Sequence, residues 1–127
     1  MGHDYEARAR AVWDAYTRGD VDRLGALLDE EVVWRPLGGE VLRGPAEVTA
    51  YLRRNEDVIS AVPHAFERAG DCVMVHGSLR RFRDGGFIDV QPSWVFRCRD
   101  GRLVSATSYE SRAAARSAIG DGRRRTD

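Results

Sequence analysis

Hydrophobic and polar positions follow two different periods along this chain, and the change of period divides it into two parts. Within residues 4–17 apolar side chains such as Val12 and Tyr16 recur at spacings of three and four, which predicts an amphipathic helix. Gly19 ends this pattern. Asp20 is suited to cap a second short helix whose leucines face the same core.

The middle of the chain alternates between extended and helical patterns. EEVVWRPL, residues 30–37, predicts a strand, and Gly44 followed by Pro45 opens a third helix. Beyond Pro63 the period becomes two. Four segments with turn residues between them then suit extended chain: 64–69, 71–82, 86–99 and 102–110. An alanine-rich helix over residues 112–119 ends at Gly120.

Helices followed by hairpin-linked strands predict an α+β fold. We expect a strongly curved antiparallel sheet that wraps around the N-terminal helices as a cone, with a pocket at its open end. One domain is expected over residues 1–120, with a disordered polar tail over 121–127.

Composition narrows the function classes. The 20 basic and 20 acidic residues cancel, so no general attraction to nucleic acid or membrane is expected. The N-terminal segment has no long apolar run, and the cytoplasm is the expected compartment. Cys72 and Cys98 are predicted to be buried free thiols. No metal-ligand spacing or phosphate-binding loop is present, so neither a metal nor a cofactor is predicted.

Four segments carry a resemblance to a known family: AVWDAYTRGDVDRLGALLDEEVVWRPLGG, LRGPAEVTAYL, GDCVMVHGSLR and WVFRCRDGRLVSATSY. In this order they resemble the nuclear-transport-factor-2-like (cystatin-like) superfamily, and within it the SnoaL-like and ketosteroid-isomerase-like group, over residues 5–120. The resemblance implies the cone-shaped α+β barrel. It does not select one activity, because one fold hosts many.

The resemblance also implies which strand residues face the cavity. The predicted inward set is Pro92, Trp94, Phe96, Cys98, Met74, His76, Ser78, Ala106, Ser108 and Glu110, with Arg80 and Val104 at its ends. On the outer face we expect Ser93 with Val73, Val75 and Leu79. An apolar row of that kind favours a homodimer through the outer sheet face.

The known chemistries of related proteins fit this chain poorly. The ketosteroid isomerase tyrosine, base and acid would fall at Val12, at Arg35 or Pro36, and at Trp94, and none of these residues can take those roles. The epoxide hydrolase pattern needs an acidic residue that segment 71–82 lacks after its first residue. A dehydratase that uses paired histidines stays a possible function, because His64 could form such a pair with His76.

The remaining polar candidates are few. His76, assisted by Glu110 or Tyr16, is the candidate for proton transfer, since an imidazole titrates near neutral pH. A hydrogen-bonded wall residue is the alternative interpretation of His76. The predicted substrate-binding residues are Trp34, Trp94, Met74, Ser78, Tyr51 and Ala106.

Three functions stay open at this stage. The first is a cofactor-independent isomerase, cyclase or hydrolase that acts on a hydrophobic ring compound. The second is a ligand-binding or accessory protein with the same fold. The third is an interaction module that uses the outer sheet face while its own side chains fill the cone.

Overall fold

Helices enclose a single curved sheet on both of its faces. A computed structural model describes residues 2–37, 39–54 and 58–126 of the chain. Within these residues the elements follow in this order: α1 (Gly2–Thr17), α2 (Val21–Leu27), β1 (Leu28–Arg35), β2 (Leu42–Arg43), α3 (Gly44–Arg54), β3 (Val58–Ala69), β4 (Cys72–Arg83), β5 (Gly86–Val90), β6 (Ser93–Arg99), β7 (Arg102–Tyr109) and α4 (Arg112–Thr126). The predicted α+β class is confirmed.

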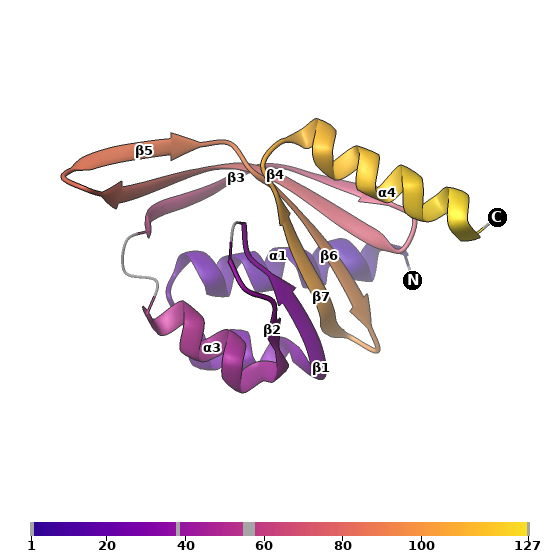
Figure 1. The fold of residues 1–127 in the computed structure, drawn as a ribbon. Helices are drawn as coiled ribbons and strands as arrows, with labels where there is room; N and C mark the ends of the chain where they lie inside the picture. The colour runs from indigo at the N-terminus through magenta and orange to yellow at the C-terminus, as the bar shows by residue number, and fades with distance from the viewer. Residues whose placement is uncertain (1, 38, 55–57, 127) are drawn as a thin grey trace.

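The strand order, taken over the described residues, is β2-β1-β7-β6-β4-β3, with β5 paired to the far half of β4. Most neighbouring strands run antiparallel, but β1 runs parallel to β7. The sheet is therefore mixed, whereas the sequence predicted a purely antiparallel one. Its end strands β2 and β3 are not paired with each other within the described chain. The sheet therefore curves over the helices without closing into a barrel (Figure 1).

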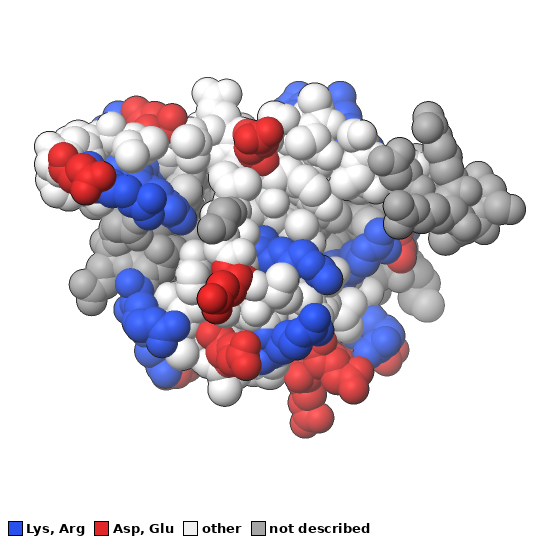
Figure 2. Space-filling model, in the orientation of Figure 1, with Lys and Arg blue, Asp and Glu red and all other residues white. Residues whose placement is uncertain are grey.

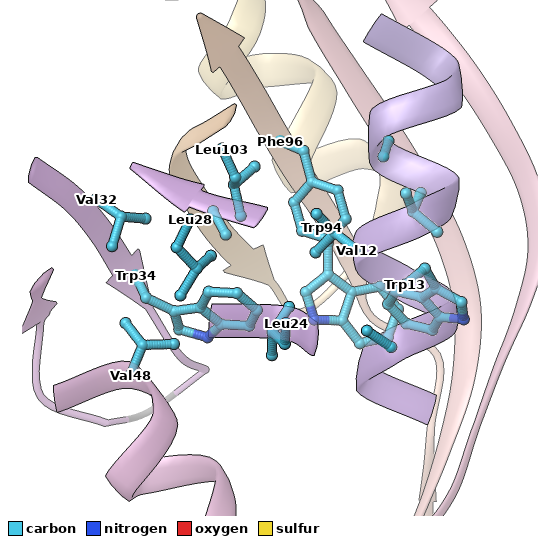
Figure 3. Close-up of a cluster of buried hydrophobic side chains, with 14 of the residues drawn as sticks. Val12, Trp13, Leu24, Leu28, Val32, Trp34, Val48, Trp94, Phe96 and Leu103 are labelled. Carbon is cyan, nitrogen blue, oxygen red and sulfur yellow. The ribbon is translucent and has the colours of Figure 1, made fainter. Parts of the chain in front are cut away.

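The inner face of the sheet packs on α1, α2 and α3, and α4 covers part of the outer face (Figure 1). The larger core joins helix residues such as Val12 and Leu24 to the strand residues Trp34, Trp94 and Phe96 (Figure 3). A smaller cluster lies on the other face. It consists of Cys72, Met74 and Val95 with Ala115 and Ile119 of α4.

Several local predictions are confirmed. Asp20 caps α2 by accepting a hydrogen bond from the backbone N–H of Arg23 at 3.1 Å. Gly44 has φ +84°, a conformation that favours glycine, where β2 turns into α3. Both cysteines are free; Cys72 is buried, and Cys98 is only half-buried.

Several element boundaries differ from the prediction, and β3 begins at Val58 and not at residue 64. The expected strand over residues 86–99 is divided into β5 and β6 around Pro92, because proline lacks the N–H that a continuous ladder needs. The backbone N–H of Gly77 instead donates to the Pro92 carbonyl at 3.2 Å. Helix α4 continues past Gly120, its predicted end, to Thr126.

The far half of β4 and the whole of β5 form an arm that extends beyond the helices (Figure 1). The Arg80 guanidinium donates two hydrogen bonds to Asp89 across the arm, at 2.7 and 2.9 Å. On the face shown in Figure 2, basic and acidic side chains alternate without a large patch of one sign. This mixture agrees with the net charge of zero.

Candidate functional site

A pocket of about 170 Å³ lies on the inner side of the sheet, where the arm leaves the body of the protein. Its walls come from α1, β1, α3 and strands β4 to β7, so residues far apart in the sequence meet there. The lining residues are Tyr16, Trp34, Pro36, Leu37, Tyr51, Leu52, Leu79, Arg81, Arg83, Ile88, Val90, Pro92, Trp94 and Ser108.

Aromatic rings connect the floor of this pocket to the core. The centroids of Trp13 and Trp94 lie 4.3 Å apart in an edge-to-face arrangement, and those of Tyr16 and Trp34 lie 6.4 Å apart. Trp34 and Trp94 come from β1 and β6 and lie on the same side of the sheet (Figure 3). Both are almost fully buried, with 5% and 6% exposed, so neighbouring packing holds their orientation.

Four of the residues predicted for the site lie in the pocket wall: Tyr16, Trp34, Tyr51 and Trp94. Ala106 lies on the same face of the sheet but is buried in the core beside Trp34 and Phe96, away from the pocket lining. Pro92 and Ser108, predicted to face inward, also line the pocket.

The predicted orientation of β4 is wrong. Val73 and Val75 pack in the inner core, and Leu79 lines the pocket, although all three were expected outside. Met74 lies in the outer cluster beneath α4. His76 follows two residues later and shares that outer face, because side chains alternate along a strand.

Ser78 also lies on the outer face. Its hydroxyl is 2.6 Å from Nε2 of His64, an exposed residue of β3. A separate surface hollow is lined there by Ser78, Arg80 and Asp89. Neither Ser78 nor Met74 therefore reaches the pocket for which the sequence predicted them.

His76 belongs to a buried polar cluster under α4 and not to the pocket. Its Nδ1 is 2.7 Å from the hydroxyl of Ser93, and its Nε2 is 3.0 Å from Oε2 of Glu67. Because a carboxylate only accepts, Nε2–H donates to Glu67, and in the neutral imidazole Nδ1 accepts from Ser93. His76 is 5% exposed and Ser93 is 1% exposed.

Glu67 joins this cluster to α4. Nη2 of Arg116 donates to both carboxylate oxygens of Glu67, at 3.0 and 3.2 Å. The hydrogen bond from His76, followed by that from Arg116, lowers the pKa of Glu67 below its usual range. The carboxylate therefore stays ionised at neutral pH and fastens α4 to the sheet.

Glu110 does not serve as the partner of His76. It is exposed and lies one residue beyond the end of β7, whereas the carboxylate that contacts His76 belongs to Glu67. The pairing of His76 with Glu110 is thus wrong in its geometry. No group of three or more potential metal ligands occurs among the described residues.

Arg81 and Arg83 are the site residues that the sequence reasoning missed. Their spacing of two from Leu79 carried the signal, because all three share one face of β4. That signal was usable only with the correct inward phase of the strand.

The curved sheet with its helices has the α+β fold of solved NTF2-like proteins. The sequence model of the SnoaL-like domain family matches residues 9–106, and the chain belongs to this family. No curated protein matches the sequence. Among the described residues, no helix is both long and apolar enough to cross a membrane.

Solved structures with the same fold are distant in sequence. An NTF2-like protein from Burkholderia pseudomallei is 24% identical, with a TM-score of 0.74 over 91% of this chain and 97% of that one. TerC, crystallised with polyporic acid, is 19% identical, with a TM-score of 0.73 over 92% and 98%. A proposed polyketide cyclase from Xanthomonas campestris is 20% identical, with a TM-score of 0.70 over 93% and 98%.

Proposed function

We propose that this protein binds a small, mainly apolar ring compound in the aromatic pocket. The observation that carries this proposal is a pocket of about 170 Å³ with Tyr16, Trp34, Tyr51 and Trp94 in its wall. An apolar cavity of roughly 150 Å³ holds one benzene-sized ring. A single ring therefore fits inside, and a larger ligand would project through the opening.

The pocket chemistry favours binding over proton abstraction. No carboxylate and no imidazole occurs among its described lining residues. A general base works best with a pKa near the operating pH, whereas a tyrosine hydroxyl ordinarily titrates near 10. With His76 and Glu110 outside the pocket, we favour the ligand-binding alternative.

An enzymatic function is the second candidate, and one observation favours it. Tyr16, Tyr51 and Ser108 line the same pocket, and hydroxyl groups of such residues can polarise a bound carbonyl group. The neighbour crystallised with polyporic acid and the proposed cyclase support a small-molecule ligand in this fold. An isomerisation or cyclisation aided by these hydroxyls would need no cofactor.

A pair of matched variants tests the binding proposal. Ser108→Leu places a larger side chain in the pocket. Ser105→Leu makes the same change on the same strand, at a position that pairs with Arg97 and does not line the pocket. Thermal unfolding is measured with a panel of single-ring compounds, because a ligand at 100 times its Kd adds about 2.7 kcal/mol. We expect at least one compound to raise the Tm of wild type and Ser105→Leu but not that of Ser108→Leu. Equal shifts in both variants, or none in wild type, would reject the proposal.

The proposal also includes a homodimer, but one that forms through the arm and not through the row of Val73 and Val75. Val73 and Val75 are buried and cannot form an interface, but Phe82 and Phe87 on the arm are 47% and 62% exposed. Their rings contact each other at a centroid distance of 5.4 Å. An exposed aromatic pair of this kind supports association with a second copy of the chain.

A further inference from the structure

A serine and a histidine meet on the outer face of the sheet, away from the aromatic pocket. Oγ of Ser78, on β4, is 2.6 Å from Nε2 of His64, on β3. When the imidazole carries its proton on Nδ1, Nε2 accepts this hydrogen bond and the hydroxyl donates it. A hydroxyl within hydrogen-bond reach of an imidazole nitrogen has the geometry of a nucleophile and its general base.

A β-bulge sets the position of His64. The residues before and after it pair with Gly77 and His76, which are adjacent on β4, so His64 is an extra residue in the ladder. Ser78 pairs with Val62, and the imidazole therefore reaches its hydroxyl diagonally across the two strands. Bulges turn a side chain to a new direction and are frequent next to active sites.

Solvent reaches this pair, in contrast to the other serine and histidine pair of the sheet. Ser78 is half-buried and His64 is exposed. His76 and Ser93 are both buried beneath α4, where no substrate could approach them. Only the pair of Ser78 and His64 thus combines a hydrogen bond between nucleophile and base with access for a small molecule.

The hollow beside Ser78 offers room for the acyl part of a substrate. Its lining residues are Ser60, Ser78, Leu79, Arg80, Asp89, Val90 and Gln91. The charged residues among this described lining are Arg80 and Asp89, and their two hydrogen bonds at 2.7 and 2.9 Å make them compensate each other. The hollow therefore favours a neutral compound. The side-chain amide of Gln91 is a donor of the kind that stabilises an oxyanion.

We propose that Ser78 and His64 form a catalytic dyad that hydrolyses small neutral esters. Oγ of Ser78 bonds to the ester carbonyl carbon while its proton passes to Nε2 of His64. The bond from that carbon to the alkoxy oxygen then breaks, and the alcohol leaves with the proton from Nε2. Water attacks the acyl group and gives a proton to His64, and Oγ takes this proton as its bond to the acid breaks. This reaction uses no residue of the aromatic pocket and does not depend on ligand binding there.

Acetylation by p-nitrophenyl acetate tests the dyad. The release of nitrophenol is followed by absorbance, and the acetyl group is located by fragmentation mass spectrometry after an acid quench. Trypsin releases residues 69–80 as one peptide, in which Ser78 is the only serine, and the sequence contains no lysine that would react with the ester. We expect wild type to carry an acetyl group on Ser78.

Two variants separate the roles of the pair. Ser78→Ala should lose the acetyl group from this peptide, even if the freed imidazole of His64 still reacts with the ester directly. His64→Gln keeps a hydrogen-bonding side chain that cannot take up a proton. We expect it to acetylate Ser78 on the order of 100-fold more slowly, the lower end of what a general base contributes, because this site is open to water.

Ser60→Ala and Ser108→Leu are the controls. The first removes a hydroxyl from the same hollow and the second fills the aromatic pocket, and both should acetylate Ser78 at the wild-type rate. Absence of the acetyl group from Ser78 in wild type, which requires no variant to fold, would overturn the proposal. An unchanged rate in folded His64→Gln would overturn the role of His64. A slower rate in Ser108→Leu would move the reaction to the pocket and would equally overturn the dyad.

Discussion

Replacing His76 with glutamine distinguishes a structural from a catalytic role for this residue. His76 bridges Ser93 and Glu67 beneath α4, and neither contact reaches the pocket. A glutamine amide can reach one of these partners but not both, since the two hydrogen bonds of the imidazole point in opposite directions. We therefore expect a loss of stability without a loss of ligand binding.

The magnitude follows from the burial of the two partners. Ser93 is 1% exposed, so a hydroxyl left without its partner cannot turn to water and costs about 1–3 kcal/mol. The side chain of Glu67 is 41% exposed, so water replaces that contact at a cost of about 0–1 kcal/mol. A glutamine amide that donates to Glu67 in place of Nε2 leaves Ser93 without its partner, which gives an expected loss of about 1–3 kcal/mol.

Thermal unfolding and fluorescence titration together measure the effect. For a chain of 127 residues, the usual unfolding entropy converts 1 kcal/mol into about 4 °C, so His76→Gln should lower the Tm by about 4–12 °C. The Kd of a pocket ligand should change less than about twofold. An unchanged Tm combined with lost binding or turnover would show that His76 acts in the pocket, and would refute this reasoning.

Three further predictions concern other parts of the structure. The lowered pKa of Glu67 stabilises the fold above the ordinary glutamate pKa, and this stabilisation is lost as the pH falls through the lowered value. In urea unfolding, Glu67→Gln should therefore have a smaller free energy of unfolding than wild type at pH 7 and the same one well below about pH 4. Gly77→Ala places a Cβ against the Val62 carbonyl and 3.3 Å from Trp94, so a urea melt should show a loss on the order of 1–3 kcal/mol, and an unchanged midpoint would contradict the close packing. Phe87→Arg should give a monomer in sedimentation experiments where wild type gives a dimer, and equal masses would exclude the arm as the interface.

The sequence predicts the fold well because most of its elements carry one clear period. The stripe of α1 buries one face, and the turn between α1 and α2 carries both a glycine and a capping aspartate. Trp34 and Trp94 could also be placed on the inner face, because the resemblance to the SnoaL-like group fixed the phase of their strands. The parallel pairing of β1 with β7 was not predictable in this way, since it joins the first strand to the last.

The phase of β4 was not readable for a physical reason. Residues Cys72 to Gly77 are all buried, because the inner face packs on the helices and the outer face lies under α4. A strand covered on both faces shows no alternation between apolar and polar side chains, and a shift of one residue moves every side chain to the other face. The pairings of Val75 with Trp94 and of His76 with Ser93 set the phase, and these pairings appear only in the structure.

The inversion of β4 changes which side chains can act on a ligand. With the strand in its observed phase, the His76 imidazole contacts Glu67 beneath α4, and the β4 side chains in the pocket wall are a leucine and two arginines. Arginine keeps its proton throughout the ordinary pH range, so it can fix an anion but cannot remove a proton. The described wall of the pocket therefore carries no carboxylate and no imidazole, and its hydroxyl-bearing residues are Tyr16, Tyr51 and Ser108. Substitution of His76 should consequently lower the stability of the fold and leave ligand binding in the pocket unchanged.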